Sequence, residues 1–195
     1  MMRGIWGDQE RYRSTYWARW GGQYYFTGDG AIRDEEGYFW IVGRVDDVVN
    51  IAGHRIGTAE LESLFVEHSA VSEAAVIGVK HEIKGQALVG FVTLRNGFTP
   101  SELLANELRD WIGHKIGAFA KPERVLFAAD LPKTRSGKIM RRVLAALSNR
   151  SDKVGDVTTL MNPEVVEQIK QMVICLLYTS PSPRDYAASR MPSSA

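Results

Sequence analysis

The sequence predicts a small α+β domain with a mixed sheet, because strand-like and helix-like segments follow one another without a strict β-α-β order. Two apolar runs, 74–79 and 88–94, are typical of buried strands. Residues 104–112 place their apolar side chains near helical spacing, and residues 139–147 are interpreted as a further helix. We place this α+β domain at residues 47–150.

A β-hairpin is predicted before the domain. Residues 24–26 (Tyr-Tyr-Phe) and 38–42 (Tyr-Phe-Trp-Ile-Val) are aromatic and β-branched runs, which favour strands. The segment Asp-Glu-Glu-Gly at 34–37 between them is typical of a turn. Residues 1–22 show no clear periodicity, so no element is predicted there.

The domain begins with a strand, a loop and a helix. Residues 48–52 suit a short strand, and residues 53–57 are interpreted as a glycine-bounded loop. Thr58 is predicted to cap a helix whose first turn carries Glu60 and Glu62. Carboxylates at that end favour the helix dipole.

Later elements follow from start signals and composition. Thr99 as N-cap, Pro100 at the first helical position and Glu102 in a capping box predict the start of the next helix. Residues 124–128 favour one more strand. Asn-Pro-Glu at 162–164 predicts a last helix that ends at about Met172.

The chain therefore divides into four predicted segments. Residues 1–46 precede the domain, 47–150 form it, and 151–173 extend it. Residues 174–195 are dense in Ser, Pro and Ala, which predicts a disordered or non-native tail.

Composition limits the class of protein. Lys+Arg 24 against Asp+Glu 23 leaves a net charge of +1, which disfavours nucleic acid as a partner. The single Cys175 excludes an internal disulfide and fits a reducing compartment. Charges interrupt the first 13 residues, so we expect no signal peptide. The apolar run 173–177 is far shorter than a membrane span, so no membrane and a cytoplasmic location are expected.

Two short motifs surround the predicted hairpin. In Tyr-Phe-Thr-Gly-Asp the carboxylate of Asp29 follows a strand and could accept two hydroxyl hydrogen bonds from a ribose. Taken alone, a simple turn aspartate explains it better. In Gly-Arg-Val-Asp-Asp, Arg44 leads from a strand into a charged segment that an ordinary polar linker would also explain.

Two further motifs carry positive charge. Residues 53–62 (GHRIGTAELE) lead from glycines into a helix N-terminus, a setting that suits anions, and Arg55 adds a cation. A plain strand–loop–helix joint explains these glycines as well. Residues 131–142 (LPKTRSGKIMRR) hold five cations. Pro132 stands where a P-loop needs Gly, and the balanced charge disfavours a nucleic-acid patch. A mobile Lys138 that reaches a phosphate or carboxylate is the sharper hypothesis.

In this order, YFTGD, GRVDDV, GHRIGTAELE and LPKTRSGKIMRR resemble the adenylate-forming superfamily, closest to the acetyl- and propionyl-CoA synthetases. His54 followed by Thr-Ala-Glu at 58–60 is similar to that branch. The resemblance covers residues 1–150. It implies that residues 1–46, with the hairpin, are the end of a large N-terminal adenylation domain. Residues 47–150 would be the C-terminal lid domain.

The resemblance implies an AMP-forming acetate–CoA ligase that uses ATP, CoA and Mg²⁺. In such enzymes a carboxylate attacks the α-phosphorus of ATP, the lid rotates, and the CoA thiol displaces AMP. A propionyl-CoA or other acyl-CoA synthetase is the nearest alternative, and a non-catalytic nucleotide- or CoA-binding module is an alternative of another class. The phosphate loop, adenine pocket and acyl pocket do not occur in this sequence, so the chain is expected to be inactive alone.

The resemblance also assigns roles to individual residues. Asp29 and Arg44 match residues that hold the ribose hydroxyls, and Arg55 matches an arginine that reaches the phosphates. Asp46 matches the hinge about which the lid turns. Lys138 matches the lysine of the adenylation step, which the family regulates by reversible acetylation through an acetyltransferase and a deacetylase.

For CoA, the resemblance implies Ala52, Gly53 and Gly113. Two of them depart from the family pattern, which usually has Ser at the position of Ala52 and a phosphate-binding Arg at that of Gly113. Lys115 is expected to replace that arginine only in part.

A cation site also follows from the resemblance. The carbonyl groups of Val66 and Val71, with His68 beside them, match a Mg²⁺ site. By spacing alone, His68 is better explained as a surface histidine at the end of a helix.

Overall fold

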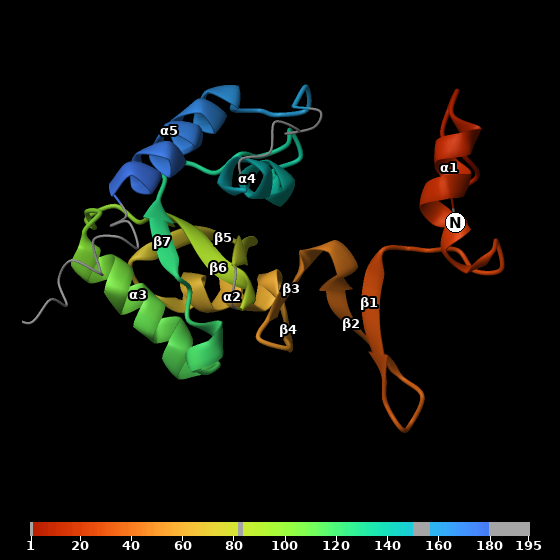
Figure 1. The fold of residues 1–195 in the computed structure, drawn as a ribbon, viewed down its shortest axis with the longest axis horizontal. Helices are drawn as coiled ribbons and strands as arrows, with labels where there is room; N and C mark the ends of the chain where they lie inside the picture. Colours follow the sequence, from red (N-terminus) through yellow and green to blue (C-terminus); the bar gives the residue numbers. More distant parts are fainter. Residues whose placement is uncertain (1, 82–83, 150–156, 180–195) are drawn as a thin grey trace, which may run out of the picture.

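The computed structural model of the chain describes residues 2–81, 84–149 and 157–179. An α+β domain lies at one end of the molecule and a helix at the other, with a β-hairpin between them (Figure 1). The predicted α+β class is confirmed. Residues 150–156 and most of the predicted tail, 180–195, lie outside the described residues.

The amino-terminal helix α1 (Gln9–Tyr16) was not predicted from the sequence. Asp8 caps it, because its carboxylate accepts a hydrogen bond from the Arg11 N–H at 2.9 Å. A short 3₁₀ turn, η1 (Ala18–Trp20), follows.

The strand predicted at 24–26 is wrong, because its aromatic side chains contact rings of α1 and of the residues that follow it, through η1. The Tyr25 ring stacks on Tyr16 with centroids 5.3 Å apart and meets Trp17 edge-on at 5.5 Å. Ring contacts with α1 and η1 thus replace the strand pairing that the sequence suggested.

The hairpin itself is confirmed in a shifted register. β1 (Asp29–Arg33) pairs antiparallel with β2 (Phe39–Arg44), so the first strand begins after the predicted one. Asp34 fixes the predicted turn, since its carboxylate accepts the Tyr38 N–H at 2.8 Å and the Trp40 indole N–H at 2.9 Å.

A 3₁₀ turn, η2 (Val45–Asp47), leads into the α+β domain. β3 (Val48–Ile51) is confirmed and pairs with β4 (His54–Gly57), so the loop predicted at 53–57 is wrong. The two turn residues have φ 49° at Ala52 and 89° at Gly53, as a two-residue hairpin with a type I′ turn requires. The left-handed conformation costs an alanine about 1–2 kcal/mol, whereas glycine adopts it freely.

Helix α2 (Thr58–Glu67) begins one residue earlier than predicted. Gly57 is the N-cap, and Thr58 is the first helical residue, with its hydroxyl buried and without a hydrogen-bond partner. The predicted cap is therefore wrong. Leu61 and Phe65 are fully buried on the apolar face of the helix.

The central sheet has the order β5-β6-β7. β5 (Val71–His81) is antiparallel to β6 (Gly85–Leu94), and β7 (Arg124–Phe127) is parallel to β6. These strands and the mixed sheet confirm the prediction.

Helix α3 (Glu102–Lys115) precedes the 3₁₀ turn η3 (Ala118–Ala120). The predicted cap Thr99 is wrong, because the Ser101 hydroxyl accepts the Leu104 N–H at 3.1 Å. The predicted apolar face is confirmed by the full burial of Leu108 and Ile112.

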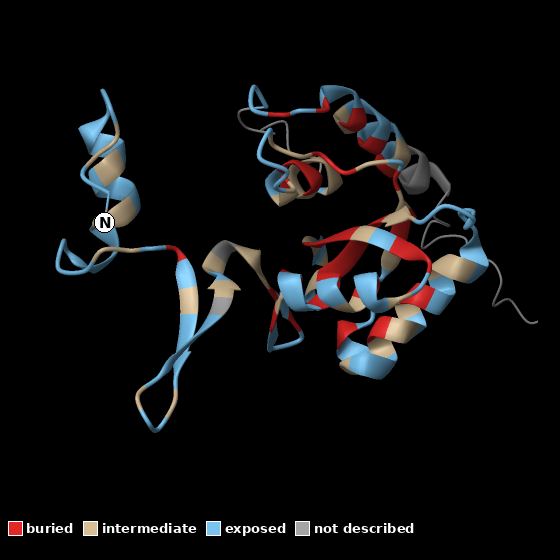
Figure 2. Cartoon of the chain, turned by 180° about the vertical axis from the view of Figure 1, so that it is seen from behind, coloured by how far each residue is buried: buried red, intermediate tan, exposed pale blue. Residues whose placement is uncertain are grey.

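Helices cover both faces of the sheet, and the buried residues gather between them (Figure 2). α2 and α3 share one apolar cluster with the sheet. α4 (Arg141–Ser148) and α5 (Pro163–Thr179) pack on the other face. The start of α5 is as predicted, but the helix runs beyond Met172.

Helix α5, which begins in the segment predicted as an extension, packs on the sheet of the domain. Val165, Ile169 and Val173 of α5 are buried in one cluster with Phe91 and Leu126 of the sheet. Among the described residues, no helix has the length and apolar character to cross a bilayer.

Candidate functional site

Asp29 and Arg44 meet at the base of the hairpin. They face each other in the β1–β2 register, with Arg44 Nη1 3.9 Å from Asp29 Oδ1 and both side chains about half exposed. The guanidinium lies over Gly28, where a Cβ would come within 2.9 Å of Arg44 Nη2. Gly28 has φ 82°, a conformation that favours glycine, and a side chain there would force the guanidinium to shift. An adjacent acceptor and donor suit the two hydroxyl groups of a ribose.

The predicted hinge, Asp46, lies in η2 between this pair and the α+β domain. Its neighbour Asp47 faces the domain, with Oδ2 3.5 Å from Arg141 Nη1 on α4. η2 is thereby tied to α4 by a charged contact across 94 residues of sequence.

Arg141 also forms a bidentate ion pair with Glu62 of α2. The Nε–Oε1 and Nη2–Oε2 distances are 2.7 and 2.5 Å, and Oε1 also accepts the Val76 N–H of β5. The hydrogen bond to Glu62 raises the pKa of Arg141, against the effect of burial. The guanidinium therefore joins α2, α4 and η2 as a permanent cation.

Lys138 lies on a tight exposed loop rather than in a P-loop. The Gly137 N–H donates to the Thr134 carbonyl at 2.8 Å, and the Thr134 N–H donates to the Lys138 carbonyl at 2.9 Å. Gly137 has φ 78°, which the turn requires. Residues 135–138 are exposed, so a well-hydrogen-bonded backbone presents the ammonium group to solvent. We call residues 133–139 the lysine loop; Lys133 and Ile139 form an antiparallel bridge at its base.

The base of the lysine loop is polar and partly buried. Lys133 Nζ lies 2.7 Å from Glu73 Oε2 and 3.0 Å from Asp130 Oδ1. The hydrogen bond to Glu73 raises the pKa of Lys133 although burial opposes it. Burial alone would raise the pKa of Asp130, but hydrogen bonds from Lys133, the Leu131 N–H and Asn162 hold that pKa below its ordinary value.

The hydrogen bonds of Asp130 predict that the free energy of unfolding decreases at acid pH. A lowered carboxyl pKa stabilises the fold above the unfolded-state value of about 3.9, and that contribution is lost as the pH falls through the folded-state pKa. We expect Asp130→Asn to lose less of its free energy of unfolding than wild type between pH 7 and pH 3. Urea unfolding of the chain at both pH values measures this. Glu35→Gln, an exposed hairpin carboxylate, is the control, and an equal pH dependence of Asp130→Asn and wild type would contradict the prediction.

Arg55 lies exposed on β4, next to the Ala52–Gly53 turn. The adjacent His54 ring stacks on Phe119 of η3, with centroids 4.2 Å apart and an angle of 26° between the planes. This stack joins the turn to the segment after α3, and sequence reasoning missed it. The predicted CoA residues Ala52 and Gly53 thus sit on a strained, exposed turn whose backbone can approach a ligand.

Gly113, on α3, leaves room for another cation that the sequence did not reveal. The Lys121 side chain lies 3.5–3.7 Å from the position of a Cβ at Gly113, and its ammonium pairs with Asp110. Lys115, which was expected to replace the missing arginine in part, pairs with Glu67 at 3.1 Å and lies over the Trp111 ring.

The predicted cation site has unfavourable neighbours. The Val71 carbonyl accepts a hydrogen bond from Arg95 Nε at 2.7 Å, which places positive charge beside a predicted ligand. His68 Nδ1 accepts the Ala70 N–H, and its Nε2 lies 3.2 Å from Glu107 Oε1. These contacts argue against Mg²⁺ at Val66, His68 and Val71. The described residues contain no group of three His, Cys, Asp or Glu side chains suited to a metal.

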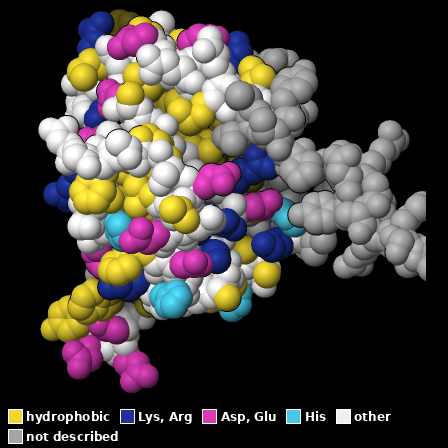
Figure 3. Space-filling view, turned by 90° about the vertical axis from the view of Figure 1, so that its left-hand side faces the viewer, with side chains coloured by type: hydrophobic (Ala, Val, Ile, Leu, Met, Phe, Trp, Pro, Cys, Tyr) yellow, Lys and Arg dark blue, Asp and Glu magenta, His cyan; other side chains and the backbone are white. Residues whose placement is uncertain are grey.

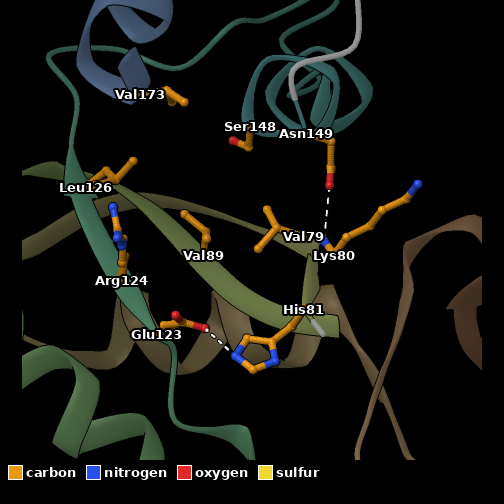
Figure 4. A pocket seen from close by; sticks show the side chains of 10 residues that line it. All are labelled: Val79, Lys80, His81, Val89, Glu123, Arg124, Leu126, Ser148, Asn149 and Val173. Carbon is orange, nitrogen blue, oxygen red and sulfur yellow. Dashed lines mark hydrogen bonds and ion pairs between the residues drawn. The ribbon is translucent and has the colours of Figure 1, made fainter. Parts of the chain in front are cut away.

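A cavity of about 340 Å³ lies between the sheet and the ends of α4 and α5 (Figure 4). His81 Nε2 is 3.7 Å from Glu123 Oε2 at its edge, and Asn149 Oδ1 accepts the Lys80 N–H at 3.1 Å. None of the residues of the four motifs lines this cavity. The cavity is therefore separate from the candidate site that those residues form.

Charges on the surface are mixed. On the face shown in Figure 3, basic, acidic and histidine side chains lie among one another without a large patch of one sign. This agrees with the balanced composition.

Comparison with known proteins defines the class. Residues 60–138 match the sequence model of the AMP-binding enzyme C-terminal domain, and this part of the chain belongs to that family. Curated relatives carry a narrower name. The chain is 58% identical over 172 residues to the acetyl-coenzyme A synthetase of Gemmatimonas aurantiaca, covering 87% of this chain and 26% of that protein. The chain thus spans about a quarter of the length of such relatives.

Solved structures agree with the fold. ATP-bound MatB from Rhodopseudomonas palustris has a TM-score of 0.63 at 29% identity, covering 78% of this chain and 29% of that one. The anthranilate CoA ligase AuaEII, in complex with anthranoyl-AMP, has a TM-score of 0.60 at 33% identity, covering 72% and 27%.

Proposed function

We propose that this chain is the C-terminal part of an AMP-forming acetate–CoA ligase, which converts ATP, acetate and CoA to acetyl-CoA, AMP and diphosphate. The observation that carries the proposal is 52–58% identity to acetyl-coenzyme A synthetases over most of the chain. The relatives are ligases that act on small molecules, which is consistent with the polar, exposed character of the site residues.

In the first step, an acetate oxygen attacks the α-phosphorus of ATP, the bond to the β-phosphate oxygen breaks, and diphosphate leaves. Negative charge accumulates on the phosphate oxygens, and the Lys138 ammonium is proposed to stabilise it. Asp29 and Arg44 would hold the ribose hydroxyls, and Arg55 would approach the phosphates. The anthranoyl-AMP bound to AuaEII supports an acyl-adenylate on this fold.

In the second step, the CoA thiol loses its proton, its sulfur attacks the acetyl carbonyl, and AMP leaves. Rotation about Asp46 would withdraw Lys138 and bring the Ala52–Gly53 turn to the pantetheine arm. Gly53 has no side chain, so its backbone can approach closely. Gly113, beside Lys121, would lie near the CoA phosphates.

Mg²⁺ is proposed to arrive with ATP, bound by phosphate oxygens and water, which is its usual mode with nucleotides. The phosphate loop and the acyl pocket would come from protein outside this chain. The isolated chain is therefore expected to be inactive.

Regulation and location complete the proposal. Lys138 is exposed on its loop, so an acetyltransferase and a deacetylase could reach it. Acetylation would remove the charge that the first step needs. A cytoplasmic location is proposed because the single cysteine fits a reducing compartment.

A graft tests the function. The chain would replace the matching segment of the Gemmatimonas aurantiaca acetyl-coenzyme A synthetase, and formation of AMP and acetyl-CoA would be followed with acetate, with propionate and with neither. Acetate-dependent AMP formation supports the proposal, and preference for propionate moves it to the neighbouring specificity. A folded graft that ignores both acids, together with binding of AMP or CoA by the chain alone, would favour a non-catalytic binding module.

A further inference from the structure

Residues 157–162 pack against the lysine loop and lie beyond residues 60–138, which match the family domain. Thr134 and Leu160 form an antiparallel bridge, and the Met161 N–H donates to the Lys133 carbonyl at 2.9 Å. The loop therefore acquires a third extended segment alongside its own two sides. We call residues 157–162 the clamp.

Asn162 makes the most specific contacts of the clamp. It is only 5% exposed, and its Nδ2 donates to Asp130 Oδ2 at 2.6 Å and to the Leu131 carbonyl at 2.9 Å. Its Oδ1 accepts the Lys133 N–H at 3.1 Å. One buried amide thus satisfies two acceptors and one donor at the base of the loop, a geometry that only an amide side chain matches.

An apolar contact completes the clamp on the other side of the loop. Leu160 is buried in one cluster with Met140, which directly follows the loop, and Val143 of α4. The Met140 N–H donates to the Pro132 carbonyl at 2.8 Å and closes the loop base. Both ends of the loop are therefore fixed to residues far away in the sequence.

Lys138 itself has a long, exposed side chain, so its position depends on how well the loop backbone is fixed. An unrestrained loop would spread the ammonium over many positions, and placement errors of about 1 Å can lower a rate by 10²-fold. We propose that the clamp, through Asn162, positions Lys138 for adenylation. The inference rests on the proposed function and assigns Asn162 as a positioning residue.

The test compares the two half-reactions in the grafted synthetase. Asn162→Ala is expected to lower acetate-dependent ATP–pyrophosphate exchange by about 10-fold, because the loop loses part of its restraint. The rate of acetyl-CoA formation from supplied acetyl-AMP should stay within about twofold of wild type, since Lys138 is withdrawn in that step. Met161→Ala is the matched control, because it removes a neighbouring exposed side chain and retains the backbone hydrogen bond.

A purely structural role of Asn162 would lower both half-reactions equally, and that result would overturn the inference, as would unchanged rates. Asn162→Asp, which keeps the volume of the side chain, should show the same selective loss because it places a second carboxylate at Asp130. Misfolding of both variants, seen as loss of both half-reactions, counts as the structural result.

A second measurement separates this inference from the proposed function. This measurement uses the chain by itself, outside the graft. Amide hydrogen exchange at Thr134 and Gly137 should be about 10-fold faster in Asn162→Ala than in the wild-type chain, while exchange in β5 and β6 is unchanged. A wild-type graft without acetate-dependent adenylation would refute the proposed function only. Unchanged exchange in the loop would refute the clamp.

Discussion

Lys138→Ala is expected to slow acetyl-adenylate formation by about 10²–10³-fold in the grafted synthetase, the cost of removing one positioned charge from a transition state. Acetyl-CoA formation from supplied acetyl-AMP should change little. The geometric basis is the exposed loop, in which hydrogen bonds between Thr134, Gly137 and Lys138 present the ammonium group. ATP–pyrophosphate exchange and the thioester reaction measure the two effects separately.

Lys170→Ala serves as the control, because this exposed lysine of α5 forms only a long ion pair with Glu167 at 3.9 Å. Lys138→Gln, which imitates the neutral acetylated side chain, should resemble the alanine variant. A Lys138→Ala enzyme with wild-type adenylation would contradict the role assigned to this lysine.

Arg141→Met is expected to lower the free energy of unfolding of the chain by about 2–3 kcal/mol, toward the lower end for breaking a buried ion pair. The variant leaves the Glu62 carboxylate, whose side chain is 11% exposed, without its bidentate partner. It also removes the contact to Asp47 in η2. Urea unfolding followed by circular dichroism measures the change.

Lys170→Met breaks the exposed ion pair with Glu167 and should cost less than about 0.5 kcal/mol. Combining Arg141→Met with Glu62→Gln should recover part of the loss, because no uncompensated charge remains. Equal effects of Arg141→Met and Lys170→Met would show that the buried pair has no special role.

The consequence for function lies in what Arg141 connects. It lies two residues after the lysine loop, and its guanidinium reaches Asp47 beside the predicted hinge. The Asp47–Arg141 contact therefore links η2 to the start of α4, three residues after Lys138. The clamp holds the opposite side of the same loop.

Local patterns predicted much of the domain. β5 and β6 were predicted because strands that are buried on both faces of a sheet form continuous apolar runs. The apolar face of α3 was predicted because its apolar residues recur at helical spacing. The turn at 34–37 was predicted because Asp and Gly favour that conformation. The resemblance of the four motifs identified the family and marked Lys138.

Predictions failed where neighbouring residues competed for the same structural role. Thr58 and Thr99 were both chosen as caps, but Gly57 and Ser101 have those positions in the structure. The aromatic run 24–26 resembles a strand, yet rings of α1 and of the residues that follow it, through η1, which the sequence had not revealed, are its packing partners.

By itself, the sequence determined the α+β class, most of the domain's strands and helices, and the identity of the motif residues. Only the tertiary structure decided which of those residues meet. Asp29 beside Arg44, Glu62 paired with Arg141, and the Asn162 amide at the base of the lysine loop join residues between 15 and 79 positions apart. Such contacts depend on the tertiary arrangement of segments that are distant in the sequence. Secondary-structure propensity and hydrophobic periodicity do not predict that arrangement, because both describe only residues that are near one another in the sequence.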